Sequence, residues 1–540
     1  MEKKGKLELT WVGKNEEIKF EPRILIEDKS KSYGDQDTGN ILIHGDNLLS
    51  LKALENEFTG KIKCIYIDPP YNTGSAFDFY DDGVEHSIWL SLMRQRLMLL
   101  RNLLRDDGYI FIQIDDNEQA YLTILMDEIF GRGNHVNTIC INMNSLSGVK
   151  MTHVINGKRF PAQKEYILLY RKGEAFSPLF IEKLHKGAWD KEYNLIIPEL
   201  EKGMFDEFQE MTDESVNEML KNMSLVSLAD FAKDNHIELT EEWKWDNAYR
   251  IFGSKSNRPL AKREHDNTYE QVLYCYTNQD GNKRFFRTDF NREARDPRIE
   301  LVQAEANSSV FLSDNWTDIS NDGGVAQEGG VTFPKGKKPE KIIERVLRCA
   351  TQEGDYVLDS FLGSGTTAAV AHKMKRRWIG IEMGEQAYSH CKKRLDNVID
   401  GSDLAGITSS YKWEGGGGYK FYELAGPLLV KHKKLPVYQL NSTYTWEMVC
   451  EAICKIEGFK YSPSGEFQGC SSENRFIHVT NEFVNGKYVM GLIKTLGDRQ
   501  SVLIYCKKMQ ADMILPANVE IKRIPKDLLG KCYFENEVEV

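Results

Sequence analysis

The stretch Lys61-Ile-Lys-Cys-Ile-Tyr-Ile-Asp-Pro-Pro-Tyr-Asn-Thr-Gly74 is an apolar strand pattern that runs directly into Asp68-Pro69-Pro70-Tyr71. The two prolines fix φ and lack N–H groups, so the carbonyls between Asp68 and Tyr71 are rigid acceptors. We expect Asp68 and the Pro69 carbonyl to accept the two hydrogens of an exocyclic amino group on a nucleobase, with Tyr71 covering the ring face. The alternative is an ordinary strand followed by a Pro-Pro turn.

A second strand and turn lie almost three hundred residues downstream, in Tyr356-Val-Leu-Asp-Ser-Phe-Leu-Gly-Ser-Gly-Thr-Thr-Ala-Ala-Val-Ala371. The strand ends at Asp359, and the glycines at 363 and 365 allow a ligand to approach the backbone closely. A short strand that ends at Glu382 follows, and this acid is suited to bind ribose hydroxyls. A nicotinamide dinucleotide site would need a third glycine at position 368, which is alanine. Phe361-x-Gly-x-Gly paired with Asp-Pro-Pro-Tyr instead resembles the signature of S-adenosylmethionine-dependent amino-methyltransferases.

Composition agrees with a large globular enzyme of two or three domains. The 540 residues are 41% hydrophobic and 28% charged, and the formal net charge is −11. Because the chain is acidic overall, any surface that binds nucleic acid must be local. The ten cysteines form no Cys-x-x-Cys pair, so we expect no metal site, no disulfide and a reducing, cytoplasmic location. No apolar run approaches the ~20 residues of a membrane span, and we expect neither a membrane anchor nor a signal peptide.

Strand and helix patterns alternate through the first 175 residues. Strands are expected at 40–46, 61–67, 108–115 and 164–170, the last at the edge of the sheet, and helices through 58, at 87–105 and at 117–130. This alternation predicts a mostly parallel sheet with helices on both faces. Asp46, at the end of the first of these strands, either caps the following helix or lies at the rim of a pocket for the cofactor's adenine.

The alternation is lost between about 175 and 330. Residues 196–242 are acidic and helix-like. From Lys244 to Arg298, twelve Lys and Arg stand against eight Asp and Glu, with aromatic residues between them. Such a segment suits contact with DNA phosphates and base edges, although a solvated surface over an aromatic core is the alternative. The expected DNA-binding residues are Arg250, Lys255, Arg258, Lys283, Arg284 and Arg287.

The chain then returns to the sheet through a basic segment and a helix at 340–350. Pro339 suits the first turn of that helix, and basic residues before a helix amino end can hold the cofactor's carboxylate. The expected cofactor-binding residues are Asp46, Lys338, Pro339, Asp359, Phe361, Gly363, Ser364, Gly365, Thr366 and Glu382. The expected catalytic residues are Asp68, Pro69, Pro70 and Tyr71.

The combined motifs resemble the modification (Mod) subunit of type III restriction-modification systems, a β-class DNA adenine-N6 methyltransferase. They are His44-Gly-Asp-Asn-Leu48, Ile65-Tyr-Ile-Asp-Pro-Pro-Tyr-Asn-Thr-Gly74, Ile112-Gln-Ile-Asp-Asp-Asn-Glu118, Ile129-Phe-Gly131, Lys337-Lys-Pro339, Phe361-Leu-Gly-Ser-Gly-Thr-Thr367 and Trp413-Glu-Gly-Gly-Gly-Gly418. The match covers about 7–175 and 330–425. The middle segment matches only by position, and the chain is short for this family. Gln163 and Lys164 also precede the strand's Glu where the family pattern would have His.

The resemblance implies methyl transfer from S-adenosylmethionine to adenine N6 in duplex DNA, with the target base flipped out of the helix. A cytosine-N4 methyltransferase would use the same geometry, although that class more often has Ser in place of Asp68. An RNA adenine methyltransferase would more often have Trp in place of Tyr71. A catalytically silent DNA-binding scaffold is the alternative from another class. Partners implied by the resemblance are double-stranded DNA, a second copy of the chain and a restriction (Res) subunit.

The expected fold class is α/β: a doubly wound, mostly parallel, Rossmann-like methyltransferase sheet with an inserted domain and a smaller α+β C-terminal domain. The expected segments are an N-terminal arm (1–40), a catalytic half (41–175), a target-recognition insert (176–330), a cofactor half (331–412), a Gly-rich linker (413–424) and a C-terminal domain for association (425–540). Residues 425–540 contain no site motif, so association or a lid over the chain's own sheet are their two expected roles.

Overall fold

The computed structural model describes residues 8–15, 23–73, 84–143, 160, 163–175, 177–319, 325–333, 336–472 and 474–529. The chain divides into two compact units. One unit is Met1–Phe180 together with Asp314–Val540, and the other is the insert Ile181–Ser313. Within the described ranges, none of the helices combines the length and apolar character needed to cross a bilayer.

An 11-stranded sheet organises the first unit, in the order β1-β19-β3-β18-β17-β4-β5-β7-β6-β16, with β2 paired to β19. Its strands are β1 (Leu25–Glu27), β2 (Tyr33–Gly34), β3 (Ile41–His44), β4 (Ile62–Ile67), β5 (Leu104–Ile114), β6 (His135–Asn142), β7 (Lys164–Arg171), β16 (Asn315–Trp316), β17 (Tyr356–Asp359), β18 (Arg377–Glu382) and β19 (Gly418–Leu424). The six neighbours from β19 to β5 pair in parallel. The expected doubly wound, mostly parallel sheet is therefore confirmed.

Helices cover the sheet as two groups. They are α1 (Asn47–Phe58), α2 (His86–Leu103), α3 (Gln119–Met126), α10 (Glu340–Ala350), α11 (Thr366–Lys373), α12 (Lys393–Ile399) and the short α13 (Thr408–Tyr411). Helix α2 contacts α1 and α3, whereas α11 contacts α10 and α12. All six residues of β4 are buried, as expected for a parallel strand covered on both faces.

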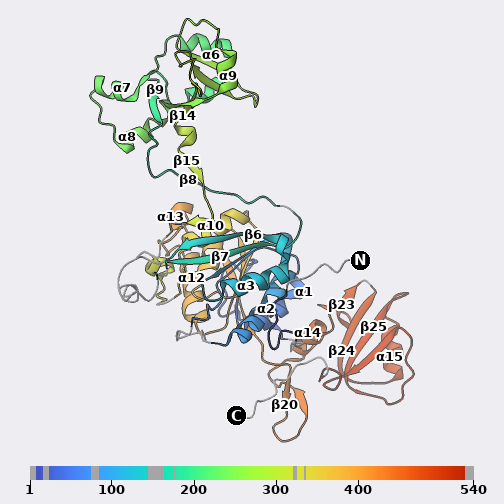
Figure 1. Cartoon of the computed structure of the whole chain (residues 1–540). Coiled ribbons are helices and arrows are strands. Elements are labelled where there is room, and N and C mark those ends of the chain that lie inside the picture. Colours follow the sequence, from blue (N-terminus) through green and yellow to red (C-terminus); the bar gives the residue numbers. More distant parts are fainter. Residues whose placement is uncertain are drawn as a thin grey trace. The chain divides into compact units, whose positions relative to one another are not determined.

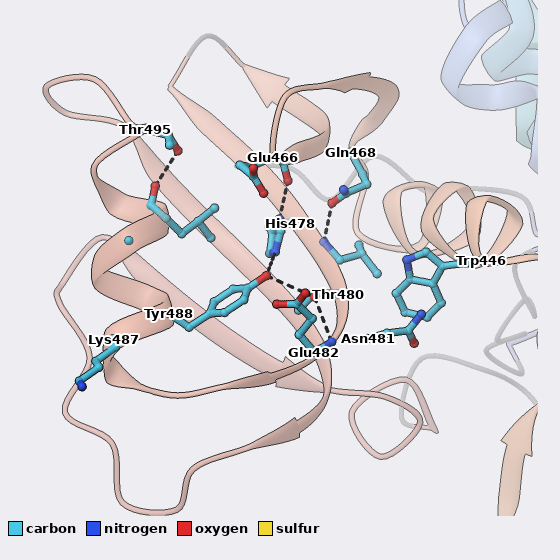
Figure 2. A pocket seen from close by; sticks show the side chains of 13 residues that line it. Trp446, Glu466, Gln468, His478, Thr480, Asn481, Glu482, Lys487, Tyr488 and Thr495 are labelled. Carbon is cyan, nitrogen blue, oxygen red and sulfur yellow. Dashed lines mark hydrogen bonds between the residues drawn. The ribbon is translucent and has the colours of Figure 1, made fainter.

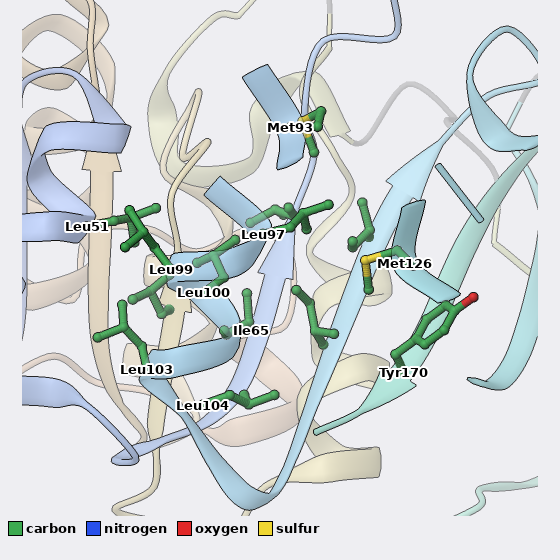
Figure 3. Packing of buried hydrophobic residues seen from close by; sticks show 14 of the residues in the cluster. Leu51, Ile65, Met93, Leu97, Leu99, Leu100, Leu103, Leu104, Met126 and Tyr170 are labelled. Carbon is green, nitrogen blue, oxygen red and sulfur yellow. The ribbon is translucent and has the colours of Figure 1, made fainter. Parts of the chain in front are cut away.

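The core beside the catalytic strand is made largely by α2. Leu97, Leu100 and Leu103 of this helix lie beside Ile65 of β4, and all four are fully buried (Figure 3). Each buried leucine contributes roughly 1.5–3 kcal/mol to stability. The strand that carries Asp68 is therefore held on a rigid base.

Strand β7 is not at the edge of the sheet, and that expectation is wrong. It lies between β5 and β6 and is antiparallel to both, which is visible for β6 and β7 in Figure 1. The neighbour that covers it, β6, alternates between exposed and half-buried positions in its first half. Since β6 has no continuous apolar run, the sequence pattern did not reveal it.

The Gly-rich segment is not a linker as predicted. Gly418 begins β19, which pairs in parallel with β3 inside the main sheet. Gly415, Gly416 and Gly417 have φ of +105°, +110° and +76°, and a Cβ on Gly415 would lie 2.7 Å from the Ile399 carbonyl oxygen. The glycines therefore allow a close-packed turn in the left-handed region of backbone conformation.

The N-terminal arm contributes to the same sheet. Strand β1 pairs with β19, and Trp11 donates from Nε1 to Ser91 Oγ of α2 at 2.8 Å. Leu9 and Trp11 pack against the core beside β4. The segment expected as a separate N-terminal arm (1–40) therefore belongs in part to the main sheet, because its later residues form strands β1 and β2.

The insert forms a separate unit with a six-stranded antiparallel sheet, β10-β9-β11-β14-β13-β12. Its elements are β8 (Lys183–His185), β9 (Tyr193–Ile196), α5 (Met204–Gln209), α6 (Asp213–Leu220), β10 (Val226–Ser227), α7 (Leu228–Asp234), α8 (Glu241–Asp246), β11 (Ile251–Ser256), α9 (Arg258–Arg263), β12 (Leu273–Thr277), β13 (Lys283–Arg287), β14 (Arg298–Gln303) and β15 (Ser309–Phe311). The acidic region is helical as expected. The unit ends at Ser313, earlier than the predicted 330, because β16 pairs with β6 of the main sheet.

The C-terminal region has its own sheet, in the order β22-β23-β24-β25-β26. Its elements are β20 (Leu429–Lys431), β21 (Tyr438–Leu440), α14 (Trp446–Ile456), β22 (Lys460–Ser464), β23 (Phe467–Ser472), β24 (Arg475–Val484), α15 (Gly486–Ile493), β25 (Ser501–Met509) and β26 (Val519–Arg523). The first three strands pair antiparallel and the last three in parallel. A smaller domain of helices and strands is thus present, as the sequence predicted.

Candidate active site

Two adjacent strands bring the two motifs together. β17 pairs in parallel with β4, and Leu358 lies opposite Ile65. Since parallel neighbours end at the same edge, Asp359 and the segment that starts at Asp68 meet at the carboxyl edge of the sheet, where α/β sheets bind ligands.

The segment after β4 is a dense polar cluster. Tyr71 Oη lies 2.8 Å from Asp68 Oδ1, and Lys338 Nζ lies 3.3 Å from the same oxygen. The Lys338 ammonium also lies 4.8 Å from the centroid of the Tyr71 ring. The Pro70 carbonyl accepts a hydrogen bond from Nε1 of buried Trp89 at 2.9 Å, which anchors the turn. Three of the four predicted catalytic residues and Lys338 thus make direct contacts that fix this turn, and Pro69 is buried between them.

Glu165, Gln113 and Tyr66 join this cluster and were not predicted. Gln113 Nε2 donates to Glu165 Oε2 at 2.7 Å, and Tyr66 Oη donates to Gln113 Oε1 at 2.5 Å. The available signal was a glutamine inside the apolar strand 108–115. The position of Glu165 depends on the antiparallel register of β7 against β5, and no local pattern reveals that register.

Burial and charge set the protonation of this cluster. Burial raises the pKa of Asp68 to about 6 against the opposing charge of Lys338. Burial also acts on Glu165, but Lys338, Gln113 and Tyr71 outweigh it and hold the pKa of Glu165 below its usual range. The pKa of Lys338 is raised, since the two carboxylates outweigh its burial. Lys338 was predicted to face the cofactor; the structure places it against the catalytic segment.

The turn after β17 is hydrogen-bonded to two nearby carboxylates, those of Asp359 and Glu382. Thr367 Oγ1 donates to Asp359 Oδ2 at 2.6 Å, and burial raises the pKa of Asp359 to about 7. Glu382, at the end of β18, accepts hydrogen bonds from the Gly363 amide at 2.7 Å and the Gly384 amide at 3.1 Å. The predicted residues Asp359, Gly363 and Glu382 therefore lie in one local structure.

The two glycines of this turn differ in their surroundings. Gly363 has φ of +58°, and a Cβ there would meet only the Phe361 carbonyl oxygen, at 4.0 Å. Gly365 has φ of +83°, and its Cβ would lie 3.2 Å from the Cα of Cys391. A side chain at Gly365 would therefore strain the backbone and crowd Cys391, so valine at this position should destabilise the fold as well as the turn.

The remaining predicted cofactor residues are placed as follows. Asp46 Oδ1 caps α1 by accepting from the Leu49 amide at 3.0 Å, the structural alternative that the sequence left open. Pro339 is the residue immediately before α10 rather than in its first turn. Ser364 and Thr366 share a hydrogen bond at 3.1 Å in the glycine turn, and Phe361 packs on the core beside β4.

The predicted DNA-binding residues divide into three groups. Lys283 is buried and donates to Asp213 Oδ1 at 2.8 Å, so its assignment to DNA contact is wrong. Arg250, Arg258 and Arg287 donate to Pro198, Asp296 and Asp289 within the same unit. Lys255 is exposed and Arg284 is half-buried. Phe252, Phe285 and Phe286 belong to the core, as the alternative of an aromatic core beneath a solvated surface required.

The C-terminal region contains a cavity of about 650 Å³ (Figure 2). Buried His478 contacts the Glu466 carbonyl oxygen through Nδ1 and Tyr488 Oη through Nε2, the latter at 2.8 Å. Tyr488 Oη in turn lies 3.2 Å from Thr480 Oγ1. Burial lowers the pKa of His478. Both ring nitrogens are thus engaged within the domain, which is the arrangement of a structural histidine.

The family model described as DNA methylase matches residues 62–393, which is more than half of the chain and includes both motifs of the site. The chain belongs to the DNA methylase family. Within this family it is 34% identical over 464 residues to the probable type III restriction-modification enzyme HindVI Mod subunit of Haemophilus influenzae. That match covers 81% of this chain and 60% of the relative.

Two other relatives carry similar descriptions. The EcoPI Mod subunit of Escherichia phage P1 is 28% identical, over 67% of this methylase chain and 60% of its own length. The StyLTI Mod subunit of Salmonella typhimurium is 27% identical, over 68% of this chain and 54% of its own length. The chain therefore spans a little over half the length of these relatives.

Proposed function

We propose that the chain transfers a methyl group from S-adenosylmethionine to N6 of adenine in double-stranded DNA, as the modification subunit of a restriction-modification system. The observation that carries the proposal is the adjacency of β4 and β17, which brings Asp68-Pro69-Pro70-Tyr71 and the Phe361-x-Gly-x-Gly turn to one edge. Membership of the DNA methylase family and the similarity to three Mod subunits support it.

The residues beyond β17 and β18 fit the proposed cofactor. Gly363 leaves its Cβ position open, as a backbone that lies against a ligand requires. The Glu382 carboxylate at the end of β18 would accept from ribose hydroxyls. Because Asp46 Oδ1 caps α1, we propose that the other oxygen of Asp46 accepts from the purine amino group. When bound, S-adenosylmethionine supplies an electrophilic methyl group on a sulfonium.

The segment after β4 fits the proposed substrate. The lone pair of an adenine amino group is delocalised into the ring, so the enzyme must localise it on nitrogen. Asp68 and the Pro69 carbonyl would do so by accepting its two hydrogens, which favours a more tetrahedral nitrogen aligned for attack. Tyr71 would cover the face of the flipped base, since the amino group is inaccessible within a duplex.

Transfer of a labelled methyl group into DNA tests this proposal. The chain would be incubated with tritiated S-adenosylmethionine and genomic DNA from a strain that lacks adenine modification, with single-stranded DNA and a transcribed RNA in parallel. We expect label in the duplex. Label confined to RNA, or no label in any acceptor, would contradict the proposal.

We propose that the insert 181–313 recognises the DNA target, and two of the predicted DNA-binding residues, exposed Lys255 and half-buried Arg284, give a prediction. The double replacement Lys255→Ala and Arg284→Ala should weaken DNA binding and reduce the salt slope of log K by about two, because each phosphate contact releases roughly one counterion. Filter binding from 50 to 200 mM salt measures the slope.

The matched control for this prediction is Arg258→Ala, which removes an exposed guanidinium already paired with Asp296. The control should change the slope by less than the double variant does. Cofactor affinity should be unaffected in all of them. A double variant with the wild-type slope would place the DNA-binding surface elsewhere.

We further propose that the C-terminal region associates with a second copy of the chain and with a restriction subunit. The region has its own buried core, and Phe483 and Met490 are 54% and 55% exposed. Because Gly418 begins a strand of the main sheet, a chain cut at Gly418 would lose part of the methylase fold. A chain that ends at Gly426 should instead be monomeric by light scattering, whereas the full chain should be dimeric; equal masses per particle would contradict the proposal.

A further inference from the structure

A second carboxylate, Glu165, lies beside the proposed catalytic segment. It is the second residue of β7, whose antiparallel course brings its first residues to the carboxyl edge of β4 and β5. Its Oε2 atom lies 2.8 Å from Tyr71 Oη, 2.7 Å from Gln113 Nε2 and 3.1 Å from Lys338 Nζ. The side chain is 16% exposed. Side chains from three other segments of the chain therefore converge on this one oxygen atom.

The Tyr71 phenol lies between two carboxylates, and its hydroxyl has only one hydrogen to donate. Its oxygen lies 2.8 Å from Asp68 Oδ1 and 2.8 Å from Glu165 Oε2, and it accepts a hydrogen bond from Lys338 Nζ at 2.7 Å. One O–H cannot be donated fully to both carboxylates. If Asp68 gains a proton, Asp68 donates to Tyr71 and Tyr71 donates to Glu165, and both short contacts become hydrogen bonds.

The surrounding charges direct an added proton to Asp68 rather than to Glu165. The titratable groups that face Asp68 are Lys338, Glu165, Tyr71, Tyr66 and Asp359. Burial and the Glu165 charge together raise the pKa of Asp68 to about 6, although Lys338 acts to lower it. The pKa of Glu165 is instead held low by Lys338 and Gln113 despite its burial. The two carboxylates thus have different roles set by their environments.

We propose that Asp68, Tyr71 and Glu165 form a hydrogen-bond chain that accepts the proton released by the methylated amino group, with Glu165 as the positioning residue at its end. This inference rests on the proposed function. As the N–C bond forms, the electron pair of the breaking C–S bond stays on sulfur and the positive charge passes to the amino nitrogen. That nitrogen then loses a proton to an Asp68 oxygen and becomes neutral, and Asp68 returns the proton to solvent after product release.

The pH dependence of single-turnover methyl transfer tests the proposed hydrogen-bond chain. With DNA and cofactor saturating, we expect the wild-type rate to fall below about pH 6, where Asp68 becomes protonated beforehand. Glu165→Gln removes a neighbouring negative charge, so the fall should move to lower pH, and the plateau rate should drop roughly tenfold. Glu165→Asp should keep the fall near its original pH. If Glu165 had a merely structural role, its replacement would lower the plateau rate without changing the pH at which the rate falls.

The matched control is Glu174→Gln, which neutralises an exposed carboxylate just beyond the other end of β7. It should leave both the plateau and the pH of the fall unchanged. A Glu165→Gln profile that coincides with the control profile in shape and position would overturn the proposal.

A double-mutant cycle tests whether Glu165 acts through Tyr71. Tyr71→Phe keeps the ring over the base and removes the bridging hydroxyl. If the two residues act as one chain, the plateau rate of Tyr71→Phe with Glu165→Gln should be close to that of the slower single variant. Fully multiplicative losses would show that Glu165 acts independently of Tyr71 and would contradict the chain.

A stability measurement gives a readout that does not depend on activity. Because the folded-state pKa of Asp68 is raised above the ordinary value of an aspartate, folding favours the protonated form of Asp68. Its contribution is fully present below the unfolded pKa and is lost as pH rises through about 6. The unfolding midpoint of the wild type relative to Asp68→Asn should therefore fall as pH rises from 4 to 7.

The same pair of measurements in the Glu165→Gln background isolates the coupling between the two carboxylates. In that background the relative unfolding midpoint should fall at lower pH, because the Glu165 charge that raises the Asp68 pKa has been removed. If the relative unfolding midpoint fell over the same pH range in the wild-type and Glu165→Gln backgrounds, the proposed coupling would be overturned. If these measurements show that Asp68 and Glu165 are coupled but the protein methylates no DNA, the proposed function is refuted while the coupling stands. Failure of the coupling and failure of the proposed function are therefore distinguishable.

Discussion

Replacement of Asp68 by alanine is expected to lower methyl transfer by about 10²- to 10³-fold, the usual loss when one preorganised polar partner of the reacting group is removed. Cofactor affinity should change little, because Asp68 contacts Tyr71 and Lys338 rather than the glycine turn. Single-turnover kinetics and calorimetry with S-adenosylmethionine measure the two quantities.

The control for this prediction is Asp106→Ala, which removes a carboxylate that is 85% exposed in the first part of β5. Its rate should be within a factor of two of wild type. If Asp68→Ala lost cofactor affinity and turnover to the same extent, Asp68 would belong to the cofactor site and the proposed assignment to the base would be wrong.

The second large effect is on stability and concerns Lys373. This fully buried ammonium lies 2.9 Å from Glu340 Oε2 and 2.7 Å from Asp403 Oδ2, and both carboxylates are also buried. Lys373→Met leaves these two carboxylates with less compensation, and breaking a buried ion pair on one side costs about 3–5 kcal/mol. Urea unfolding should show a loss of that size.

Two comparisons make the Lys373 prediction specific. Lys393→Met removes an exposed ammonium from α12 and should change the free energy of unfolding by less than about 0.5 kcal/mol. Glu340→Gln added to Lys373→Met removes one of the uncompensated charges and should cost less than the sum of the two single changes. A Lys373→Met variant as stable as Lys393→Met would contradict the account of this network.

Local patterns predicted the framework of the sheet well. The apolar run before Asp68 is β4 at Ile62–Ile67, and helix α10 has the predicted bounds Glu340–Ala350. Both depend on neighbouring residues: a run of buried side chains for the strand, and an apolar stripe at helical spacing after Pro339 for the helix. The two motif turns were predicted for the same reason.

Features that depend on distant pairing were missed. Glu165 reaches Tyr71 only because β7 reverses direction next to β5, and Gly418 joins the sheet only because β19 pairs with β3. A glycine run has the same composition in a linker and in a tight turn. Likewise, Lys283 was assigned to a basic surface because the sequence does not show that β13 turns its side chain toward Asp213. Charge counts along a segment do not reveal which charges are already paired.

The most direct test of the central claim is the identity of the methylated base. DNA that lacks adenine modification would be treated with the chain and S-adenosylmethionine, digested to nucleosides and analysed by mass spectrometry, with Asp68→Ala in parallel. The account predicts N6-methyladenine with the wild type and a loss of about 10²-fold or more with the variant. N4-methylcytosine as the product, or no methylated base with a folded wild-type chain, would contradict it.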